Sequence, residues 1–171
     1  MTKNKKLGKR TSIRMSILRS QASELLWHGK IETTVDRAKS VRRIAEKIVT
    51  LGINTYEDTV KVNKDKLNKK DETIKVEYVN DGPKKLAARR KMMAILRDLK
   101  EIQGENEKKA DYKKRVADIK YPLIEKVFRE YAPKYAARKE ELGTGGGYTR
   151  IIRLGNRRGD NAEKCILEMI D

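Results

Sequence analysis

Apolar residues recur at helical spacing through most of this chain and alternate only near its end. Between about Ser12 and His28 they return every three or four residues, a period that places them on one face of a helix. These positions are Ile17, Leu18, Ala22, Leu25 and Leu26. Gly29 is suited to end this helix because glycine readily adopts the left-handed backbone. The Thr-rich run from Ile31 to Val35 predicts a brief strand.

A second helix is predicted after that strand, with Asp36 as its N-cap and Gly52 as its end. Its apolar residues form a single stripe made of Ala38, Val41, Ala45, Ile48 and Val49. The cationic residues Arg37, Arg42, Arg43 and Lys47 lie outside this stripe. The pattern therefore predicts an amphipathic helix with a basic outer surface.

The segments 53–82 and 101–120 differ from their surroundings and are expected to be peripheral insertions. The first contains a period-two run at Thr73 to Val79 that fits a strand, followed by a turn signal at Asn80 to Pro83. The second has few large apolar groups, so we expect a solvated helical extension or a loop. Both insertions are expected to face solvent or other proteins more than nucleic acid.

A third helix is predicted from Pro83, a residue that suits a first helical position. The residues expected to face inward, themselves or through their neighbours, are Leu86, Met93, Leu96 and Leu99. Its first turns hold Lys84, Lys85, Arg89, Arg90 and Lys91. Because these cations oppose the positive end of the helix dipole, anions are expected nearby.

The core pattern restarts at Tyr121-Pro122 and predicts a fourth helix that ends near Leu142, with a break or kink at Pro133. Its inward residues, Leu123, Val127 and Tyr131, are spaced by four. The glycine-rich run at 143–147 then ends all helical structure. Beyond it, Tyr148 to Leu154 and Lys164 to Ile170 predict a hairpin of two strands whose face of Cys165, Leu167 and Met169 packs against the helices.

These elements indicate an α+β fold over residues 1–171, organised as a single domain. The chain has 171 residues, of which 37% are hydrophobic and 39% charged, so it can bury one modest core. Residues 1–10 carry five cations among small or polar residues and are expected to form a flexible basic arm. We expect helices packed on a small sheet that ends in a C-terminal β-hairpin.

The net charge of +17 is concentrated in particular segments. Residues 1–52 hold 13 Lys and Arg against 4 Asp and Glu, and residues 83–100 hold 7 against 1. The insertions are balanced, with 6 against 7 and 6 against 5. One basic run is about as often a solvated face as a binding site. Several runs on separate elements beside neutral segments favour a surface matched to a polyanion, and nucleic acid is the first candidate.

The candidate phosphate-binding residues are mostly arginines, whose planar fork suits phosphate oxygens. They are Lys3, Lys5, Lys6, Lys9, Arg10, Arg14, Arg19, Arg37, Arg42, Arg43, Arg89, Arg90, Arg150, Arg153, Arg157 and Arg158. Arg150 and Arg153 fall on opposite faces of one strand, so at least one of them points outward with the loop pair Arg157-Arg158. The hairpin tip is therefore a candidate phosphate site.

Enzymatic constellations are not evident, and no cofactor, metal or small-molecule substrate is expected. His28 is the single histidine, and its available partner Cys165 lies on a predicted apolar strand face. The single cysteine also excludes an intramolecular disulfide and a multi-thiolate zinc site. The glycines at 143–147 lack the ending of a P-loop and precede a strand. Asp160 is better explained as a turn former.

The chain shows no apolar run after its first lysines and no stretch of about 20 apolar residues, so we expect neither a signal peptide nor a membrane span but a soluble cytosolic protein. The common DNA-reading motifs and the aromatic strands of RNA-recognition modules are not recognisable. A folded RNA, contacted through its phosphates and sugars, is therefore the preferred partner.

Two sequence blocks resemble the bacterial large-subunit ribosomal protein family numbered seventeen. The first runs from Leu7-Gly8-Lys9-Arg10 through Ile31 to Lys39 and on to Leu51, and the second joins Gly146-Gly147-Tyr148-Thr149-Arg150-Ile151 to Arg158-Gly159-Asp160-Asn161-Ala162. Weaker matches cover Pro83 to Leu96 and Lys126 to Arg138. The resemblance spans about two-thirds of the chain and leaves out both insertions. Tyr148 joins the candidate RNA-binding residues through the second block.

The resemblance implies a helical layer on a small mixed sheet and a non-enzymatic structural role in the cytoplasmic ribosome. It further implies binding to large-subunit ribosomal RNA near the polypeptide exit tunnel and contact with a neighbouring ribosomal protein. Two other hypotheses remain: a nucleoid or RNA-remodelling factor that acts at many sites, and an RNA-modifying enzyme. The enzyme hypothesis lacks a recognisable set of catalytic residues.

Overall fold

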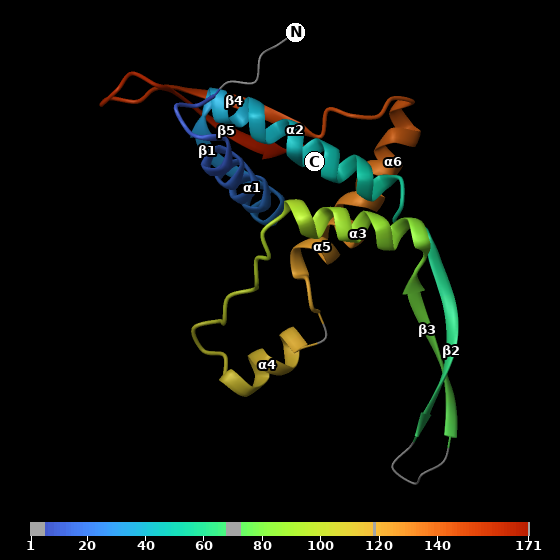
Figure 1. Cartoon of the computed structure of the whole chain (residues 1–171). Coiled ribbons are helices and arrows are strands. Elements are labelled where there is room, and N and C mark those ends of the chain that lie inside the picture. Colours follow the sequence, from blue (N-terminus) through green and yellow to red (C-terminus); the bar gives the residue numbers. More distant parts are fainter. Residues whose placement is uncertain (1–5, 68–72, 118, 171) are drawn as a thin grey trace.

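The computed structural model describes residues 6–67, 73–117 and 119–170 and shows an α+β fold, as the sequence predicted (Figure 1). In chain order the elements are α1 (Thr11–His28), β1 (Lys30–Thr34), α2 (Val35–Ile53), β2 (Thr59–Leu67), β3 (Thr73–Asp81), α3 (Pro83–Ile95), α4 (Lys109–Ala117), α5 (Pro122–Lys126), the π-helical turn η1 (Val127–Tyr131), α6 (Ala132–Leu142), β4 (Thr149–Asn156) and β5 (Glu163–Met169). The predicted C-terminal hairpin is formed by β4 and β5 and is confirmed.

The main sheet has three strands in the order β1-β5-β4, and both pairings are antiparallel. The expectation of a mixed sheet was wrong in this respect, because the early strand β1 enters beside β5 in the opposite direction, with Lys30 paired to Glu168. Alternation along β5 buries Cys165 and Leu167 completely and leaves Met169 half-buried against the core. The predicted inward face of this strand is therefore confirmed.

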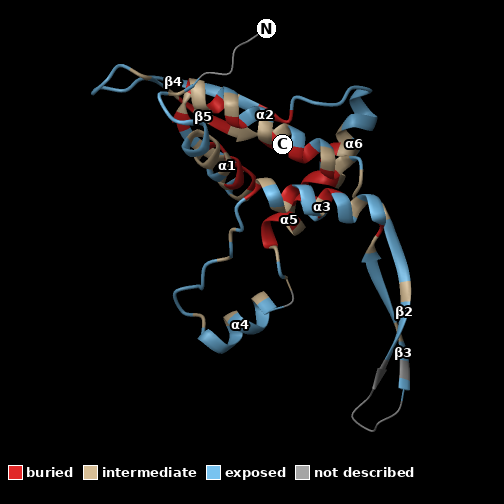
Figure 2. Ribbon diagram, viewed as in Figure 1, coloured by how far each residue is buried: buried red, intermediate tan, exposed pale blue. Residues whose placement is uncertain are grey.

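The core lies where α1 and α2 pack on this sheet and on the helices α5 and α6 (Figure 2). The predicted stripe of α2 is buried along its whole length. None of its five residues, from Ala38 to Val49, is more than 1% exposed. On α1 the buried face holds Leu18, Ala22, Leu25 and Leu26, and Gly29 ends the helix in the left-handed conformation at φ 78°. The helical spacing alone thus predicted most of the residues in this interface.

Two local predictions about helix positions need correction. Asp36 lies in the first turn of α2 and Thr34 takes the N-cap position, because Val35 begins the helix and is buried in the core. A carboxylate in the first turn still favours the positive helix end. On α3 the buried Met92 is the neighbour of the predicted Met93, and Leu96 just after the helix is only 7% exposed, as predicted. Leu86 is 38% exposed, because the helix turns Ala88 inward in its place.

Pro133 is accommodated without ending the helical path. The turn η1 immediately before it is π-helical, and the backbone N–H of Ala132 donates to the carbonyl of Val127. Because proline has no N–H and its ring crowds the preceding turn, the wider turn relieves the clash and Pro133 becomes an early residue of α6. The predicted kink at this position is thus a π-helical turn between α5 and α6.

Both insertions extend away from the rest of the chain (Figures 1 and 2). The first is a long hairpin in which β2 pairs with β3 from Thr59↔Asp81 to Leu67↔Thr73, and the strand β2 was not predicted. The second contains the predicted helical extension as α4, none of whose residues is buried. No helix in the described part of the chain combines the length and hydrophobicity needed to cross a membrane.

The described part of the N-terminal arm is folded onto the body. Leu7 packs against the core, and the backbone of Lys9 donates to the carbonyl of Lys6 over 3.2 Å. One apolar side chain thus contacts the body from the arm, and the flexibility expected for residues 1–10 stays a prediction. Lys3 and Lys5, which were predicted to bind RNA, lie outside the described residues.

Candidate nucleic-acid interface

The outer surface of α2 is cationic because its apolar stripe fixes which positions face outward. With Ala38, Val41 and Ala45 inside, Lys39 and Lys47 are exposed on the opposite side. The single carboxylate among the outward residues of this stretch, Glu46, accepts hydrogen bonds from Arg42 Nε at 3.0 Å and from Thr149 Oγ1 at 2.9 Å. The fold thus uses this acid to tie α2 to β4, and the neighbouring lysines keep their charge.

Three basic segments that are distant in sequence meet at one groove, with a volume of about 560 Å³. The α2–hairpin groove is lined by Leu7, Thr34, Val35, Asp36, Arg37, Lys39, Arg157, Asp160, Ala162 and Glu163. Its three cations face three carboxylates, so the groove is not itself a phosphate pocket. It shows instead that the N-terminal residues, the start of α2 and the tip of the β4–β5 hairpin form one continuous surface.

The hairpin tip is organised by Asp160. Its carboxylate accepts two hydrogen bonds from the Arg157 guanidinium, at 2.8 Å and 2.5 Å, and one from the Ala162 backbone N–H at 3.3 Å. The hydrogen bonds from Arg157, followed by that from Ala162, lower the pKa of Asp160 to about 2. The expected role of Asp160 as a turn former is thereby confirmed. Arg158 remains exposed next to this clamp.

A bulge directs the outer half of the hairpin. The β4–β5 register shifts between Arg153 and Gly155, and Gly155 takes φ +101°, which few residues other than glycine adopt. Residues 152–161 are all exposed. The tip therefore projects beyond the sheet, as Figure 1 shows. Arg153 and Arg158 are both exposed on it.

The predicted RNA-binding residues fall into groups with different surroundings. Within the described residues, no carboxylate pairs with the exposed cations Lys6, Lys9, Arg10, Arg90, Arg153 and Arg158 or with the half-buried Arg14, Arg19 and Arg37. Arg43 is exposed on α2. Arg19 is notable because its Nε is buried without a hydrogen-bond partner. The cations without a carboxylate partner among the described residues keep their charge available for an external anion.

Four predicted arginines instead bind carboxylates of this chain. Arg42 pairs with Glu46, Arg157 pairs with Asp160, and Arg150 pairs with Glu168 at 3.8 Å. These three are 44%, 51% and 61% exposed, so water weakens the pairs and the guanidinium groups still reach the surface. Arg89 differs from these three because only 17% of its side chain is exposed.

Arg89 holds the fold together from inside. Its guanidinium bridges Asp81 at the end of β3 and Glu125 on α5, both at 2.5 Å, and lies 5.2 Å from the centre of the Phe128 ring. Burial works to lower the pKa of Arg89, but the hydrogen bonds to the two carboxylates outweigh it and the pKa is raised. The structure therefore gives Arg89 an intramolecular role and leaves its exposed neighbour Arg90 on the surface.

The anions expected near the start of α3 are present and belong to this chain. Gly82 occupies the N-cap position of α3 and offers no side chain, so the Asp58 carboxylate takes that role and accepts hydrogen bonds from the backbone N–H groups of Lys84 at 2.7 Å and Lys85 at 3.2 Å. The Lys85 ammonium lies 3.6 Å from Asp81. The cations at this helix end therefore need no external anion to be tolerated.

Tyr148 is only 5% exposed, and its ring lies 4.8 Å from that of Tyr135. The Tyr135 hydroxyl donates to the carbonyl of Ile170 at 2.7 Å. These contacts join α6 to the open end of the β4–β5 hairpin, where β4 begins and β5 ends. The geometry thus gives Tyr148 a packing role behind the strand, while the flanking Arg150 reaches the surface.

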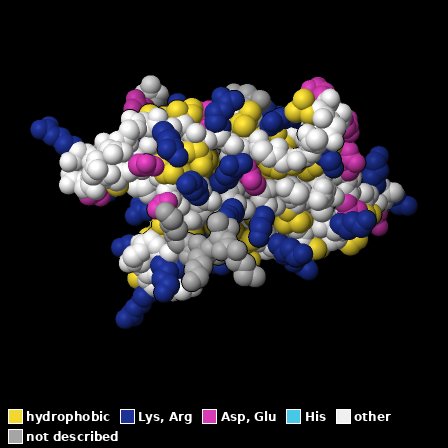
Figure 3. Space-filling model, turned by 90° about the horizontal axis from the view of Figure 1, so that it is seen from above, with side chains coloured by type: hydrophobic (Ala, Val, Ile, Leu, Met, Phe, Trp, Pro, Cys, Tyr) yellow, Lys and Arg dark blue, Asp and Glu magenta, His cyan; other side chains and the backbone are white. Residues whose placement is uncertain are grey.

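Cationic side chains are spread over the face that contains α2 and the β4–β5 hairpin, and they also mark the far end of the hairpin (Figure 3). Sequence reasoning omitted Lys39 and Lys47 from the candidate list. The spacing of the α2 stripe could have identified both, because positions one after Ala38 and one before Ile48 point away from the core.

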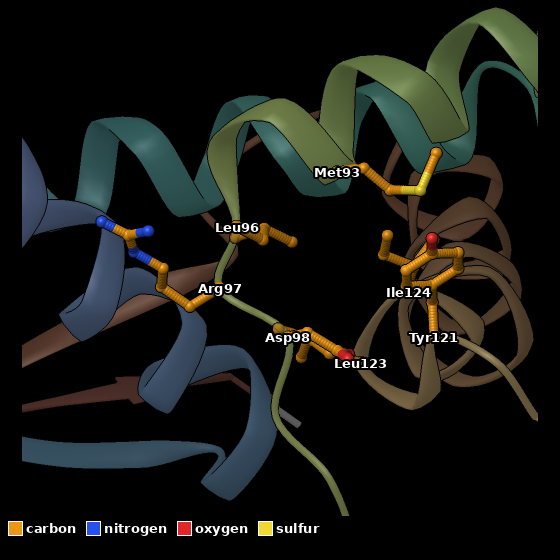
Figure 4. Close-up of a pocket in the computed structure, with 7 residues that line it drawn as sticks. All are labelled: Met93, Leu96, Arg97, Asp98, Tyr121, Leu123 and Ile124. Carbon is orange, nitrogen blue, oxygen red and sulfur yellow. The ribbon is translucent and has the colours of Figure 1, made fainter.

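The residues considered for catalysis do not form a site. Cys165 is fully buried, whereas His28 is exposed and its Nε2 lies 3.2 Å from Glu24. A separate cavity of about 190 Å³ is lined mostly by apolar residues of α3, α5 and the segments next to them (Figure 4). The Arg97 guanidinium at its edge points away from the cavity and donates to Ser16 Oγ at 3.1 Å. No metal-binding group of three or more His, Cys, Asp or Glu occurs within the described residues.

Comparison with known proteins identifies the family of this chain. The family model of ribosomal protein L17 matches residues 17–170. The chain belongs to this family. Large ribosomal subunit protein bL17 of Lachnospira eligens is 37% identical over 190 aligned residues, which cover 99% of this chain and 100% of the relative. The bL17 of Finegoldia magna is 38% identical over 171 residues, covering 100% and 87%, and that of Acetivibrio thermocellus is 33% identical over 194 residues, covering 99% and 100%.

The L17 match confirms the resemblance drawn from the two sequence blocks and the assignment to bacterial large-subunit ribosomal proteins. L17 is a family of ribosomal structural proteins and not of enzymes. The second block flanks the outer half of the hairpin: residues 146–151 include the start of β4, and residues 158–162 include Asp160 of the clamp. Part of the resemblance therefore lies in residues that shape the projecting tip.

Proposed function

We propose that this L17 chain is a structural constituent of the large ribosomal subunit that binds ribosomal RNA through one composite cationic surface. The surface joins residues 6–10, the outer face of α2 and the tip of the β4–β5 hairpin. Its exposed members without a carboxylate partner among the described residues are Lys6, Lys9, Arg10, Lys39, Lys47, Arg153 and Arg158. The supporting observation is that three separate basic segments converge on the α2–hairpin groove.

The chemistry of this surface suits a phosphate backbone. Exposed Lys and Arg side chains neutralise phosphates, and the counterions that are released make the affinity fall steeply with salt. The cations on the surface are distributed over residues 6–10, the helix α2 and a hairpin tip, so they match an extended polyanion better than a single small ligand. Folded RNA offers such a target through its phosphates and sugars, without base-edge reading.

The experiment compares two triple variants that remove the same charge. The test variant replaces Lys39, Lys47 and Arg158 by Gln, and the control replaces the exposed insertion residues Lys75, Lys108 and Lys113 by Gln. We expect the test variant to bind large-subunit ribosomal RNA about 100-fold more weakly near 0.15 M salt and to reduce the salt slope by about 2 to 3 units. The control variant is expected to change the affinity less than threefold.

Equal losses in both variants would contradict the composite surface and indicate binding through overall charge. A wild-type chain that does not co-sediment with large subunits at physiological salt would contradict the ribosomal role itself. The proposed position near the polypeptide exit tunnel, and the contact with a small neighbouring ribosomal protein, rest on the L17 resemblance. Crosslinks from Arg158 in assembled subunits to RNA far from the tunnel would refute that position.

A further inference from the structure

The β2–β3 hairpin has two chemically different faces. Because directly opposed residues in an antiparallel pair share a face, the register places Val60 and Val62 on the same side as Val76 and Tyr78. We call these four residues the hairpin strip. Val60 is 46% exposed and Tyr78 is 37% exposed, so the strip is open to solvent.

The opposite face is mostly polar and carries charges of both signs. There Lys61 pairs with Glu77 at 2.9 Å, and Asp65 stands opposite Lys75. On the strip side, the ammonium of Lys64 lies 5.6 Å from the centre of the Tyr78 ring, and no described carboxylate pairs with it. One face is thus suited to water, whereas the other combines apolar groups with a cation that lacks an acidic partner.

The root of the hairpin is fixed to the body. Besides accepting from α3, Asp58 accepts a hydrogen bond from the Gly82 N–H to its backbone carbonyl at 2.8 Å, and Asp81 is held by Arg89. A Cβ on Gly82 would lie 2.4 Å from the Asp58 carboxylate, so the two segments approach as closely as glycine allows. These contacts hold the direction in which two nine-residue strands, about 30 Å long, project from α3.

The strip does not resemble the RNA-facing surface. Residues 59–67 and 73–81 hold four Lys and no Arg against three Asp and Glu, whereas residues 1–52 carry 13 cations against 4 acids. On the strip side the register also places Lys64, Lys66 and Ile74, and the apolar side chains that dominate this side gain little from a phosphate backbone. An isolated two-stranded hairpin is also only marginally stable in water, and packing of its apolar face against another surface supplies the missing stabilisation.

We propose that the hairpin strip docks onto an apolar patch of a neighbouring folded protein, with an acidic side chain of that protein facing Lys64. The inference rests on the proposed function only in placing this neighbour within the large subunit. Tyr78 is the central anchor, because its ring combines the largest apolar area of the strip with a cation held above it. The polar face with Lys61 and Glu77 stays in solvent.

The test uses the full chain assembled into large subunits in bacteria. Tyr78 is replaced by the photo-crosslinking amino acid p-benzoyl-phenylalanine, and the matched control carries it at Val79, which is 64% exposed on the opposite face of the same strand. We expect position 78 to give a crosslink to a different protein at least fivefold stronger than position 79. A Lys64→Glu substitution should reduce this crosslink about tenfold, whereas Lys75→Glu on the polar face should leave it unchanged.

Each other outcome overturns the proposal. Crosslinks from position 78 to RNA would assign the hairpin to RNA binding, and crosslinks to a second copy of this chain would indicate self-association. Equal yields from positions 78 and 79, or no crosslink from either, would show that the strip faces solvent. Because assembly and RNA affinity are measured on the same particles, intact RNA binding with a failed crosslink refutes this inference alone. Failed RNA binding refutes the proposed function.

Discussion

The carboxylate of Asp58 caps a helix that begins 25 residues later, accepting a hydrogen bond from the backbone N–H of Lys84 at 2.7 Å. This contact joins the loop after α2 to the start of α3 and closes the base of the β2–β3 hairpin. It also supplies a negative charge where Lys84 and Lys85 would otherwise crowd the positive helix end.

Removing this cap should destabilise the fold. We expect Asp58→Ala to lower the free energy of unfolding by about 1 to 2 kcal/mol, because the first backbone N–H groups of α3 lose their acceptor. Urea unfolding followed by the fluorescence of Trp27, the single tryptophan, measures the change. Asp65→Ala, an exposed acid on the same hairpin, serves as control and should change stability by less than about 0.5 kcal/mol.

The adjacent residues Arg89 and Arg90 should separate stability from RNA binding. Arg89→Ala leaves Asp81 and Glu125 without their shared partner in a mostly buried position, and we expect a loss of about 2 to 4 kcal/mol in urea unfolding. Arg90→Ala should leave stability within about 0.5 kcal/mol and weaken RNA binding. A stable Arg89→Ala variant with reduced RNA affinity would show that Arg89 contacts RNA.

The Arg89 pair also predicts a pH dependence. Burial works to raise the pKa of Asp81, but the hydrogen bond and charge of Arg89, aided by Lys85, outweigh it and the pKa is lowered. A lowered carboxyl pKa stabilises the folded state above the ordinary pKa of about 4, and this contribution is lost as the pH falls below it. Unfolding free energies of the wild type and Asp81→Asn should therefore converge between pH 6 and pH 3.

The clamp at the hairpin tip should stay closed in moderate acid. Since the pKa of Asp160 is about 2, its carboxylate remains ionised at pH 3 and keeps its hydrogen bond from the Ala162 N–H. We expect the NMR shift of the Ala162 amide to change little between pH 5 and pH 3. In Arg157→Gln the same shift should titrate with a midpoint at about pH 4. Identical titrations in the two proteins would disprove the clamp.

Cys165 should be chemically inert while the protein is folded. The side chain is fully buried, and burial raises the pKa of its thiol despite the opposing charge of Arg153. Because the thiolate is the reactive form, we expect modification by a disulfide reagent at pH 8 to be at least about 100-fold slower in the native chain than in urea. Rapid native labelling would indicate that β5 opens readily.

The helices of this protein could be predicted because their evidence is local. The stripe of α2 and the end of α1 at Gly29 follow from spacing and backbone chemistry within one segment. The strand β2 was missed because Lys64, Asp65 and Lys66 interrupt its alternation, and only pairing with β3 makes it a strand. The antiparallel direction of β1 depends on a partner strand whose paired residues are 130 to 138 positions away in the sequence.

For the candidate site, too, some properties follow from the sequence and others only from the fold. Sequence alone determined that the chain is basic, where the charge is concentrated and to which ribosomal family it belongs, since composition and motif residues are properties of the chain itself. Only the tertiary structure decided which cations remain available to an external anion. Asp81 and Glu125 form ion pairs with Arg89, whereas the adjacent Arg90 is exposed to solvent. The reason is that an ion pair depends on the distance between two side chains in space, and folding sets that distance independently of their separation in the sequence.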